Sequence, residues 1–164
     1  MSGFLLVRVD DRLLHGQVTI GWGSWLRPGS YWIVDDQIAA DALASALYEA
    51  ALPEGAELFI LETAAFLERA RSAVGLEKGF LLLRGLEPLR RLCEKGFLPS
   101  EVNLGGLHHR MGTREFADYL FLGAEDLATI RWLIGRGIVL YAQDLPTSPR
   151  LPLDEILSQG EERT

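Results

Sequence analysis

The sequence predicts an α/β protein of three layers, α/β/α, in which helices cover both faces of a mainly parallel central sheet of about seven strands. Short apolar runs alternate with segments of helical periodicity along the chain, a pattern typical of βαβ units. The chain has 164 residues, of which 48% are hydrophobic, and such a chain can bury one sizeable core. We therefore expect a single domain over residues 1–164.

Each expected strand is a short run rich in Leu, Ile, Val and Phe, bounded by turn-forming residues. These runs are residues 4–9, 31–34, 57–61, 79–83, 101–104, 116–121 and 138–143. Because the runs are separated by helical segments rather than by tight turns, most of the strands should lie parallel to one another.

The expected helices carry apolar residues at helical spacing, as Ile38 and Leu43 show for the second helix. These helices are residues 17–27, 37–51, 63–73, 86–95, 124–135 and 153–158. Gly21 and Gly23 lie inside the first of them, where each costs about 1 kcal/mol relative to alanine. A close approach of this helix to the sheet would explain both glycines.

Composition excludes several classes of protein. The net charge of −7 and the pI near 5.0 argue against a nucleic-acid-binding protein, which would present a basic face. Cys93 is the only cysteine, so neither a disulfide framework nor a cysteine-based zinc site is expected. The N-terminus lacks the pattern of a signal peptide, and no apolar run approaches the roughly 18 residues that span a bilayer. We expect a cytoplasmic protein that does not insert into membranes directly.

The most informative stretch is residues 8–18, Arg-Val-Asp-Asp-Arg-Leu-Leu-His-Gly-Gln-Val. It connects the first expected strand to the first expected helix, and in open α/β sheets ligands bind at that edge. His15 can act as a nucleophile or base near neutral pH, and Arg12 can hold a phosphate with two hydrogen bonds. Asp10 or Asp11 can fix the imidazole tautomer, and Gly16 lets an anion approach the backbone. These groups suit the transfer of a phosphoryl group.

The same stretch resembles the phosphorylation-site segment of enzyme IIB in the mannose/fructose/sorbose class of the bacterial sugar phosphotransferase system. The resemblance continues along most of the chain. Residues 33–39, Ile-Val-Asp-Asp-Gln-Ile-Ala, resemble the family's second strand and turn, and residues 102–106, Val-Asn-Leu-Gly-Gly, resemble its glycine loop. Gly137-Ile138 and the strand that follows resemble its C-terminal region.

The resemblance implies a phosphotransferase that works as a phosphohistidine carrier. A IIA protein would phosphorylate His15, and the group would pass to a sugar entering through a membrane IIC/IID permease. In this hypothesis Asp10 orients the ring, while Arg12 and the backbone amides near Gly16 and Gln17 hold the phosphoryl oxygens. Asn103 donates a hydrogen bond to the phosphate or braces the His15 loop. The resemblance implies neither a metal nor a cofactor.

Two pairs of aspartates allow an alternative hypothesis within phosphoryl transfer, a site that binds Mg²⁺. Val9-Asp10-Asp11 and Val34-Asp35-Asp36 both end expected strands, and neighbouring strands would align four carboxylates that could hold Mg²⁺. That arrangement also needs an Asp after the third strand, where this chain has Glu62, and a later Lys that is absent. Asp36 could instead simply cap the second helix.

The remaining histidines, His108 and His109, could join His15 in a metal site, as a small metal-dependent hydrolase would require. One of them could instead support the site or bind a partner. The basic segments around residues 8–15 and 108–114 would form a positive basin if they meet in space. A phosphorylation-responsive regulatory module would keep His15 and Arg12 without passing phosphate to sugar. No nucleotide-binding fingerprint is present, so a carrier fits better than a kinase.

Overall fold

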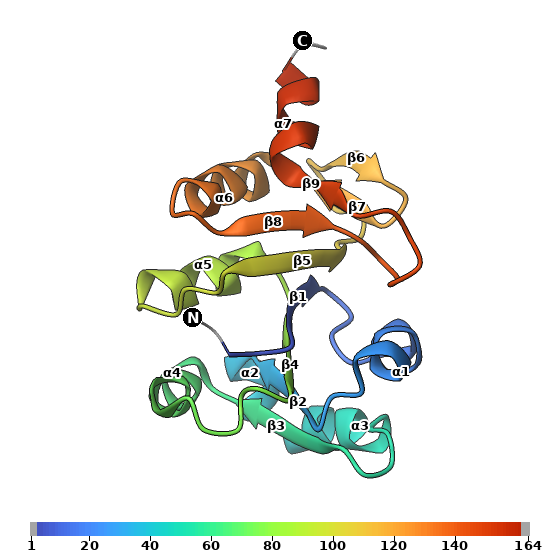
Figure 1. The fold of residues 1–164 in the computed structure, drawn as a ribbon, viewed down its shortest axis with the longest axis vertical. Helices are drawn as coiled ribbons and strands as arrows, with labels where there is room; N and C mark the ends of the chain where they lie inside the picture. Colours follow the sequence, from blue (N-terminus) through green and yellow to red (C-terminus); the bar gives the residue numbers. More distant parts are fainter. Residues whose placement is uncertain (1–2, 162–164) are drawn as a thin grey trace.

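The computed structural model describes residues 3–161 and confirms the three-layer α/β/α architecture (Figure 1). Its central sheet has seven strands in the order β3-β2-β4-β1-β5-β8-β9. All neighbouring strands are parallel except β8 and β9. The strands are β1 (Leu6–Asp10), β2 (Ser30–Val34), β3 (Glu57–Leu61), β4 (Gly79–Leu83), β5 (Glu101–Gly106), β8 (Val139–Ala142) and β9 (Leu151–Pro152).

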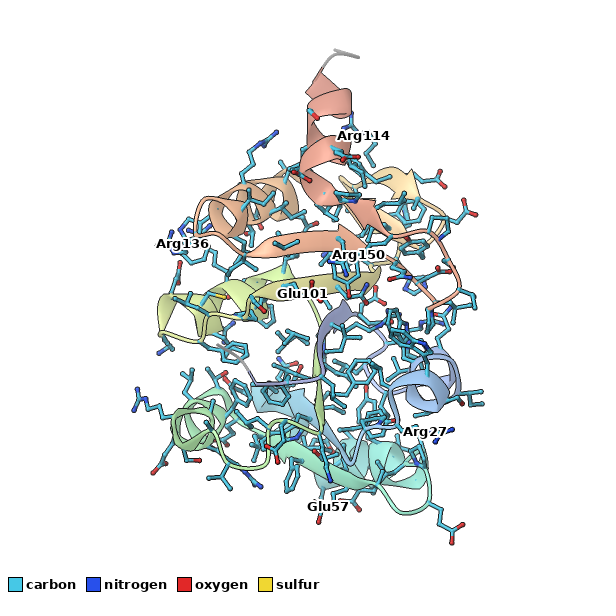
Figure 2. All side chains as sticks on the ribbon, in the orientation of Figure 1. Arg27, Glu57, Glu101, Arg114, Arg136 and Arg150 are labelled. Carbon is cyan, nitrogen blue, oxygen red and sulfur yellow. The ribbon has the colours of Figure 1, made fainter. Side chains whose placement is uncertain are left out.

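Helices cover the sheet on both sides. On one side lie η1 (Gln17–Trp22), α1 (Gly23–Leu26), α2 (Asp36–Ala39) and α3 (Ala42–Ala50), and on the other α4 (Thr63–Ser72), α5 (Leu86–Glu94), α6 (Ala124–Ile134) and α7 (Leu153–Glu161). Figure 2 shows side chains filling the space between the layers, whereas the labelled Arg27 and Arg136 lie at the margin. Each face of the sheet therefore has its own apolar core.

Side chains along β1 alternate between the two cores, as a period of two requires. Val7 and Val9 pack with the α4, α5 and α6 side, whereas Leu6 packs with the η1 and α3 side. Arg8 and Asp10 share the face of Leu6. Two charged residues in the central strand thus point toward η1, the helix that follows the loop carrying His15.

The topology places the end of β1 at a switch point of the sheet, where the strand order changes direction. From β1 the chain continues to β2, beyond β4 on one side, while β5 pairs with β1 on the other side. In open α/β sheets ligands bind at such a switch point, outside the carboxyl ends of the strands. The loop of residues 11–16 lies there.

Several sequence-based expectations about elements were wrong. The expected strand 116–121 is a hairpin of β6 (Arg114–Ala117) and β7 (Leu120–Leu122) outside the central sheet. The expected helix 37–51 is divided into α2 and α3, because Asp41 caps a new helix by accepting hydrogen bonds from the amides of Leu43 and Ala44. The expected helix 17–27 is confirmed over residues 17–26, although it begins as a π-helix, η1, before it becomes α1.

The expected row of four carboxylates is also wrong, because β4 lies between β1 and β2. Asp36 is not the cap of the second helix either. Asp35 is the N-cap of α2 and accepts from the amides of Gln37 and Ile38, while Asp36 accepts a hydrogen bond from the Thr63 amide at 2.7 Å. The two pairs of aspartates therefore have separate partners and do not form one site.

The close approach to the sheet is confirmed for Gly23, whereas Gly21 approaches the loop that follows β8. A Cβ atom on Gly23 would lie 2.6 Å from the hydroxyl of Tyr31 in β2, and one on Gly21 would lie 2.7 Å from a methyl carbon of Leu145. Both distances are too short for a side chain. The missing side chains let η1 and α1 lie directly against the sheet and the loop that follows β8.

We expect Asp41→Ala to lower the free energy of unfolding by about 1 kcal/mol, because the first turn of α3 would lose its cap. Urea denaturation measures the change. Asp41→Asn should retain most of the stability, and Glu49→Ala on the exposed side of α3 is the matched control. Equal stabilities for Asp41→Ala and Glu49→Ala would contradict the capping role.

Candidate functional site

The loop between β1 and η1 is anchored by its two leucines. Leu13 is fully buried, with a φ of 55°, and its amide donates to the carbonyl oxygen of Asp10 at 2.9 Å. Leu14 is buried in the same core. A left-handed conformation is unfavourable for leucine, so tertiary packing must hold it. The side chains on either side of the leucines remain accessible, since that of Arg12 is 46% exposed and that of His15 17%.

Asp10, rather than Asp11, holds the His15 ring. The Nε2 atom of His15 lies 3.0 Å from Oδ2 of Asp10. Because a carboxylate can only accept, Nε2 carries the hydrogen in this pair and Nδ1 keeps the lone pair. The arrangement matches the carboxylate–imidazole pair of a catalytic triad, in which the acid fixes the tautomer of the ring.

Asp10 is itself held from behind by Arg8, and both side chains are fully buried. The Arg8 guanidinium donates to Oδ2 of Asp10 from Nη2 at 3.0 Å and from Nε at 3.3 Å. Oδ1 of Asp10 accepts from the Arg12 amide at 3.1 Å. Burial by itself raises the pKa of Asp10, but the His15 hydrogen bond and the charge of Arg8 outweigh it and lower the pKa below its usual value. Asp10 is therefore a carboxylate at neutral pH.

Asn103 lies behind Arg8. Its Oδ1 accepts from Nη1 of Arg8 at 2.6 Å, and its Nδ2 donates to the carbonyl oxygen of Gln143 at 3.0 Å. The same carbonyl accepts from Nη1 of Arg8 at 3.1 Å. Asn103 is fully buried, so of the two roles expected for it, the geometry favours bracing the site over contact with a phosphate.

Arg12, Gly16 and Gln17 lie on the open side of the site. Nη2 of Arg12 donates to Oε1 of Gln17 at 3.0 Å, which points the guanidinium toward the start of η1. A Cβ atom on Gly16 would have no neighbour within 4 Å, so the backbone beside His15 is open to approach. Binding of a phosphoryl group by these three residues stays a prediction.

The two basic segments of the sequence do meet at this edge. Asp11 accepts from the backbone amide of His108 at 2.7 Å and pairs with its Nδ1 at 2.6 Å. Neighbouring aspartates therefore hold two different histidines, Asp10 holding His15 and Asp11 holding His108. His109 contacts the edge of Phe121, with ring centroids 5.7 Å apart. Among residues 3–161, no group of three or more His, Cys, Asp or Glu side chains is arranged to hold a metal ion.

Sequence reasoning missed the roles of Arg8 and of the Gln143 carbonyl. A signal for Arg8 was available: it lies in an apolar strand, two residues before Asp10, and therefore on the same face. The approach of the Gln143 backbone from β8 could not be found from spacing.

Known proteins resemble this chain along nearly its whole length. Residues 4–164 match the model of the PTS system sorbose subfamily IIB component. The chain belongs to this family. It is therefore a IIB component of the mannose/fructose/sorbose class and has a phosphotransferase role in sugar transport by the phosphotransferase system.

Individual relatives support the assignment. The N-acetylgalactosamine-specific phosphotransferase enzyme IIB component 1 of Escherichia coli (strain K12) is 30% identical over 145 residues, which cover 87% of this chain and 90% of the relative. The PTS system mannose-specific EIIAB component of the same organism is 28% identical over 155 residues. That match covers 94% of this chain but 48% of the relative, so the chain spans about half of that protein.

Solved structures show the same fold. The crystal structure of the E. coli N-acetylgalactosamine-specific IIB component 1 aligns with a TM-score of 0.84 and 28% identity, covering 90% of this chain and 97% of that one. The IIBSor domain of the sorbose permease from Klebsiella pneumoniae aligns with a TM-score of 0.86 at 21% identity and covers 95% and 96% of the two chains. Within the part of the chain that the structure describes, no helix is long and apolar enough to cross a membrane.

We expect Asp10→Asn to lower the free energy of unfolding at pH 7 by about 3–5 kcal/mol, because Arg8 would lose its buried counter-ion. A carboxyl group whose pKa is lowered by folding stabilises the protein above its unfolded pKa, and this stabilisation is lost as the pH falls through the folded pKa. The difference between the variant and the parent should therefore narrow below about pH 4.

Urea denaturation at several pH values measures this difference. Asp11→Asn is the matched control, since its carboxylate is partly exposed and its partner lies at the surface. An equal loss in both variants, or a loss in Asp10→Asn that does not change with pH, would contradict the buried pairing.

Proposed function

We propose that this chain is a cytoplasmic phosphocarrier that accepts a phosphoryl group on His15 from a IIA protein and passes it to a sugar taken up by a membrane IIC/IID permease. The contact between Asp10 and Nε2 of His15 carries the proposal. It leaves Nδ1 as the nucleophilic atom of a ring that is accessible but held in one orientation.

In the first step the lone pair of Nδ1 attacks the phosphorus of the donor's phosphohistidine, opposite the nitrogen that leaves. A bond between Nδ1 and phosphorus forms, the phosphorus–nitrogen bond of the donor breaks, and its electron pair returns to the donor imidazole. Nε2 of His15 keeps its hydrogen, so the phosphorylated ring carries positive charge. The Asp10 carboxylate, which accepts from Nε2, balances that charge.

The open side of the site supplies contacts for the phosphoryl oxygens. The Arg12 guanidinium can hold two oxygens at once, and the backbone amides of Gly16 and Gln17 can donate to a third. Gln17 keeps Arg12 beside the ring. Phosphoryl transfer depends mainly on such positioning and on charge stabilisation, so no cofactor enters this proposal.

In the second step a sugar hydroxyl attacks the phosphorus and the bond to Nδ1 breaks, which restores the imidazole lone pair. The hydroxyl proton leaves to solvent or to a base of the membrane partner. Asn103 acts at a distance in both steps, because it holds Arg8, and Arg8 holds Asp10.

The partners are inferred from the relatives. The mannose-specific relative is an EIIAB component of which this chain matches 48%, which supports a IIA protein as donor. The resemblance to sorbose-specific EIIB components and to the IIBSor domain of a sorbose permease supports a permease as acceptor.

We expect His15 to take up one phosphoryl group that is labile in acid and stable in base. The chain would be incubated with phosphoenolpyruvate, the general phosphotransferase proteins and a IIA protein, and the site mapped by mass spectrometry. His15→Ala should remain unlabelled. His108→Ala is the matched control, because it removes the other aspartate-held histidine and should be labelled normally.

A chase with membranes containing the permease and a candidate sugar extends the test. Loss of label from His15 with formation of sugar phosphate supports the carrier. Stable label in the presence of a functional permease and its sugar would favour the regulatory module instead.

We expect Arg12→Lys to slow phosphorylation of His15 by about tenfold or more, because lysine keeps the charge but lacks the planar fork that holds two oxygens. The free energy of unfolding should change by less than about 0.5 kcal/mol, since this side chain is half exposed. Quenched-flow labelling and urea denaturation measure the two effects. A labelling rate within twofold of the parent would remove Arg12 from the site.

A further inference from the structure

We propose that Gly105 is a positioning residue for phosphoryl transfer, because its missing side chain leaves the space that the Arg8 guanidinium occupies. The inference rests on the proposed role of His15 and extends it to a residue of β5. It also assigns a physical task to the first glycine of the pair at residues 105–106, which the transfer mechanism leaves unexplained.

The space at Gly105 is filled by Arg8. A Cβ atom built on Gly105 overlaps the Cζ atom and both terminal nitrogens of the guanidinium. A Cβ atom on Gly106 would lie 3.2 Å from Oδ1 of Asp10, which is tight but tolerable by comparison. Of these two positions, residue 105 is the one where any side chain must displace the arginine.

The pairing of β1 with β5 explains why this position lies under the guanidinium. Arg8 is in register with Asn103 and Val9 with Leu104, but Asp10 is in register with Gly106. Gly105 is thus the extra residue of a β-bulge. Bulges change the direction of neighbouring side chains and are common next to active sites. Here the bulge lets β5 pass beneath a buried ion pair without placing a side chain there.

The Arg8 guanidinium cannot move away from its position without losing hydrogen bonds. It is fully buried and donates to Asp10, Asn103 and the Gln143 carbonyl. The Cζ atom of Arg8 also lies 5.5 Å from the centre of the Trp22 ring. A shift away from residue 105 would break hydrogen bonds that water cannot replace in the core. An alanine at position 105 would therefore separate Arg8 from Asp10 or push β5 away from β1.

Separation of Arg8 from Asp10 would change the protonation and orientation of the His15 ring, because Asp10 contacts both residues. Arg8 and His15 share Oδ2 of Asp10, and the Arg12 guanidinium approaches Oδ1 at 4.0 Å. Withdrawal of the Arg8 charge makes proton uptake easier for the coupled Asp10–His15 pair, whichever group receives the proton. Protonation of the pair at a higher pH would remove either the lone pair of Nδ1 or the Asp10 acceptor that orients the ring.

The test is Gly105→Ala, with Gly85→Ala as the matched control. Gly85 lies outside the site in extended backbone, and a Cβ atom there would approach Pro88 no closer than 3.7 Å. With saturating phosphorylated IIA protein, Gly105→Ala should label His15 about tenfold to a hundredfold more slowly. The acid side of its pH–rate profile should move to higher pH by about one unit. Gly85→Ala should match the parent in both measurements.

Imidazole ¹⁵N NMR gives a readout that needs no phosphate donor. The parent should show His15 with hydrogen on Nε2, and Gly105→Ala should show a mixture of tautomers and a raised titration midpoint. If the parent is not labelled on His15, the proposed function fails whatever the spectra show. If the parent is labelled and Gly105→Ala matches it in rate, pH profile and tautomer, the role of Gly105 is wrong.

A double-mutant cycle with Arg8→Lys separates action through Arg8 from a general effect on the sheet. Because lysine lacks the guanidinium that occupies this space, Gly105→Ala should cost little more in the Arg8→Lys background. Additive losses would overturn the proposal. If Gly105→Ala does not fold, Asn103→Leu provides the decision, since it removes another support of Arg8 at similar volume. Asn103→Leu should also move the acid side of the pH–rate profile to higher pH. An unchanged profile would overturn the proposal.

Discussion

The burial of the Arg8–Asp10 pair is the constraint on which the rest of the site depends. Two charges at the centre of a sheet are costly to remove from water unless every hydrogen-bonding group finds a partner. Here the partners come from four parts of the chain: β1 itself, the loop with Arg12 and His15, Asn103 in β5, and the Gln143 carbonyl after β8. No buried side-chain nitrogen or oxygen atom within the described residues lacks a hydrogen-bond partner.

This requirement links the His15 ring to the scaffold. His15 lies in a loop, but its orientation is set by a carboxylate that cannot move without breaking buried hydrogen bonds. The loop is held independently by Leu13 and Leu14 in the core. The glycines of η1 and α1 let these helices pack closely, and the Trp22 indole donates to the Asp144 carbonyl at 2.7 Å. A site at the surface is thereby held by the core, as the proposed transfer by positioning requires.

The two faces of the sheet differ in the side chains that they bury. The face covered by α4, α5 and α6 is built from apolar side chains, including the buried Cys93, whose pKa burial raises to about 11. A thiol in that state is not a nucleophile at neutral pH. The face covered by η1 and α3 accepts Arg8 and Asp10, because the loop that leads into η1 carries His15, the partner of Asp10. Neighbouring Asp11 ties the loop after β5 to the same edge through His108.

The sequence by itself determined the fold class, because alternating apolar runs and helical periodicities depend only on local spacing. It also determined that Asp10, Arg12 and His15 lie near one another, since they fall within six consecutive positions of the chain. Tertiary structure alone decided which aspartate holds which histidine, because the two are neighbours and only the face of the strand distinguishes them. It also decided the strand order, which separates the two aspartate pairs, and the helix break at Asp41. Above all, it placed Asn103, Gly105 and the Gln143 carbonyl around Arg8. These groups are brought together by parallel pairing of distant strands, and no local pattern in the chain records that pairing.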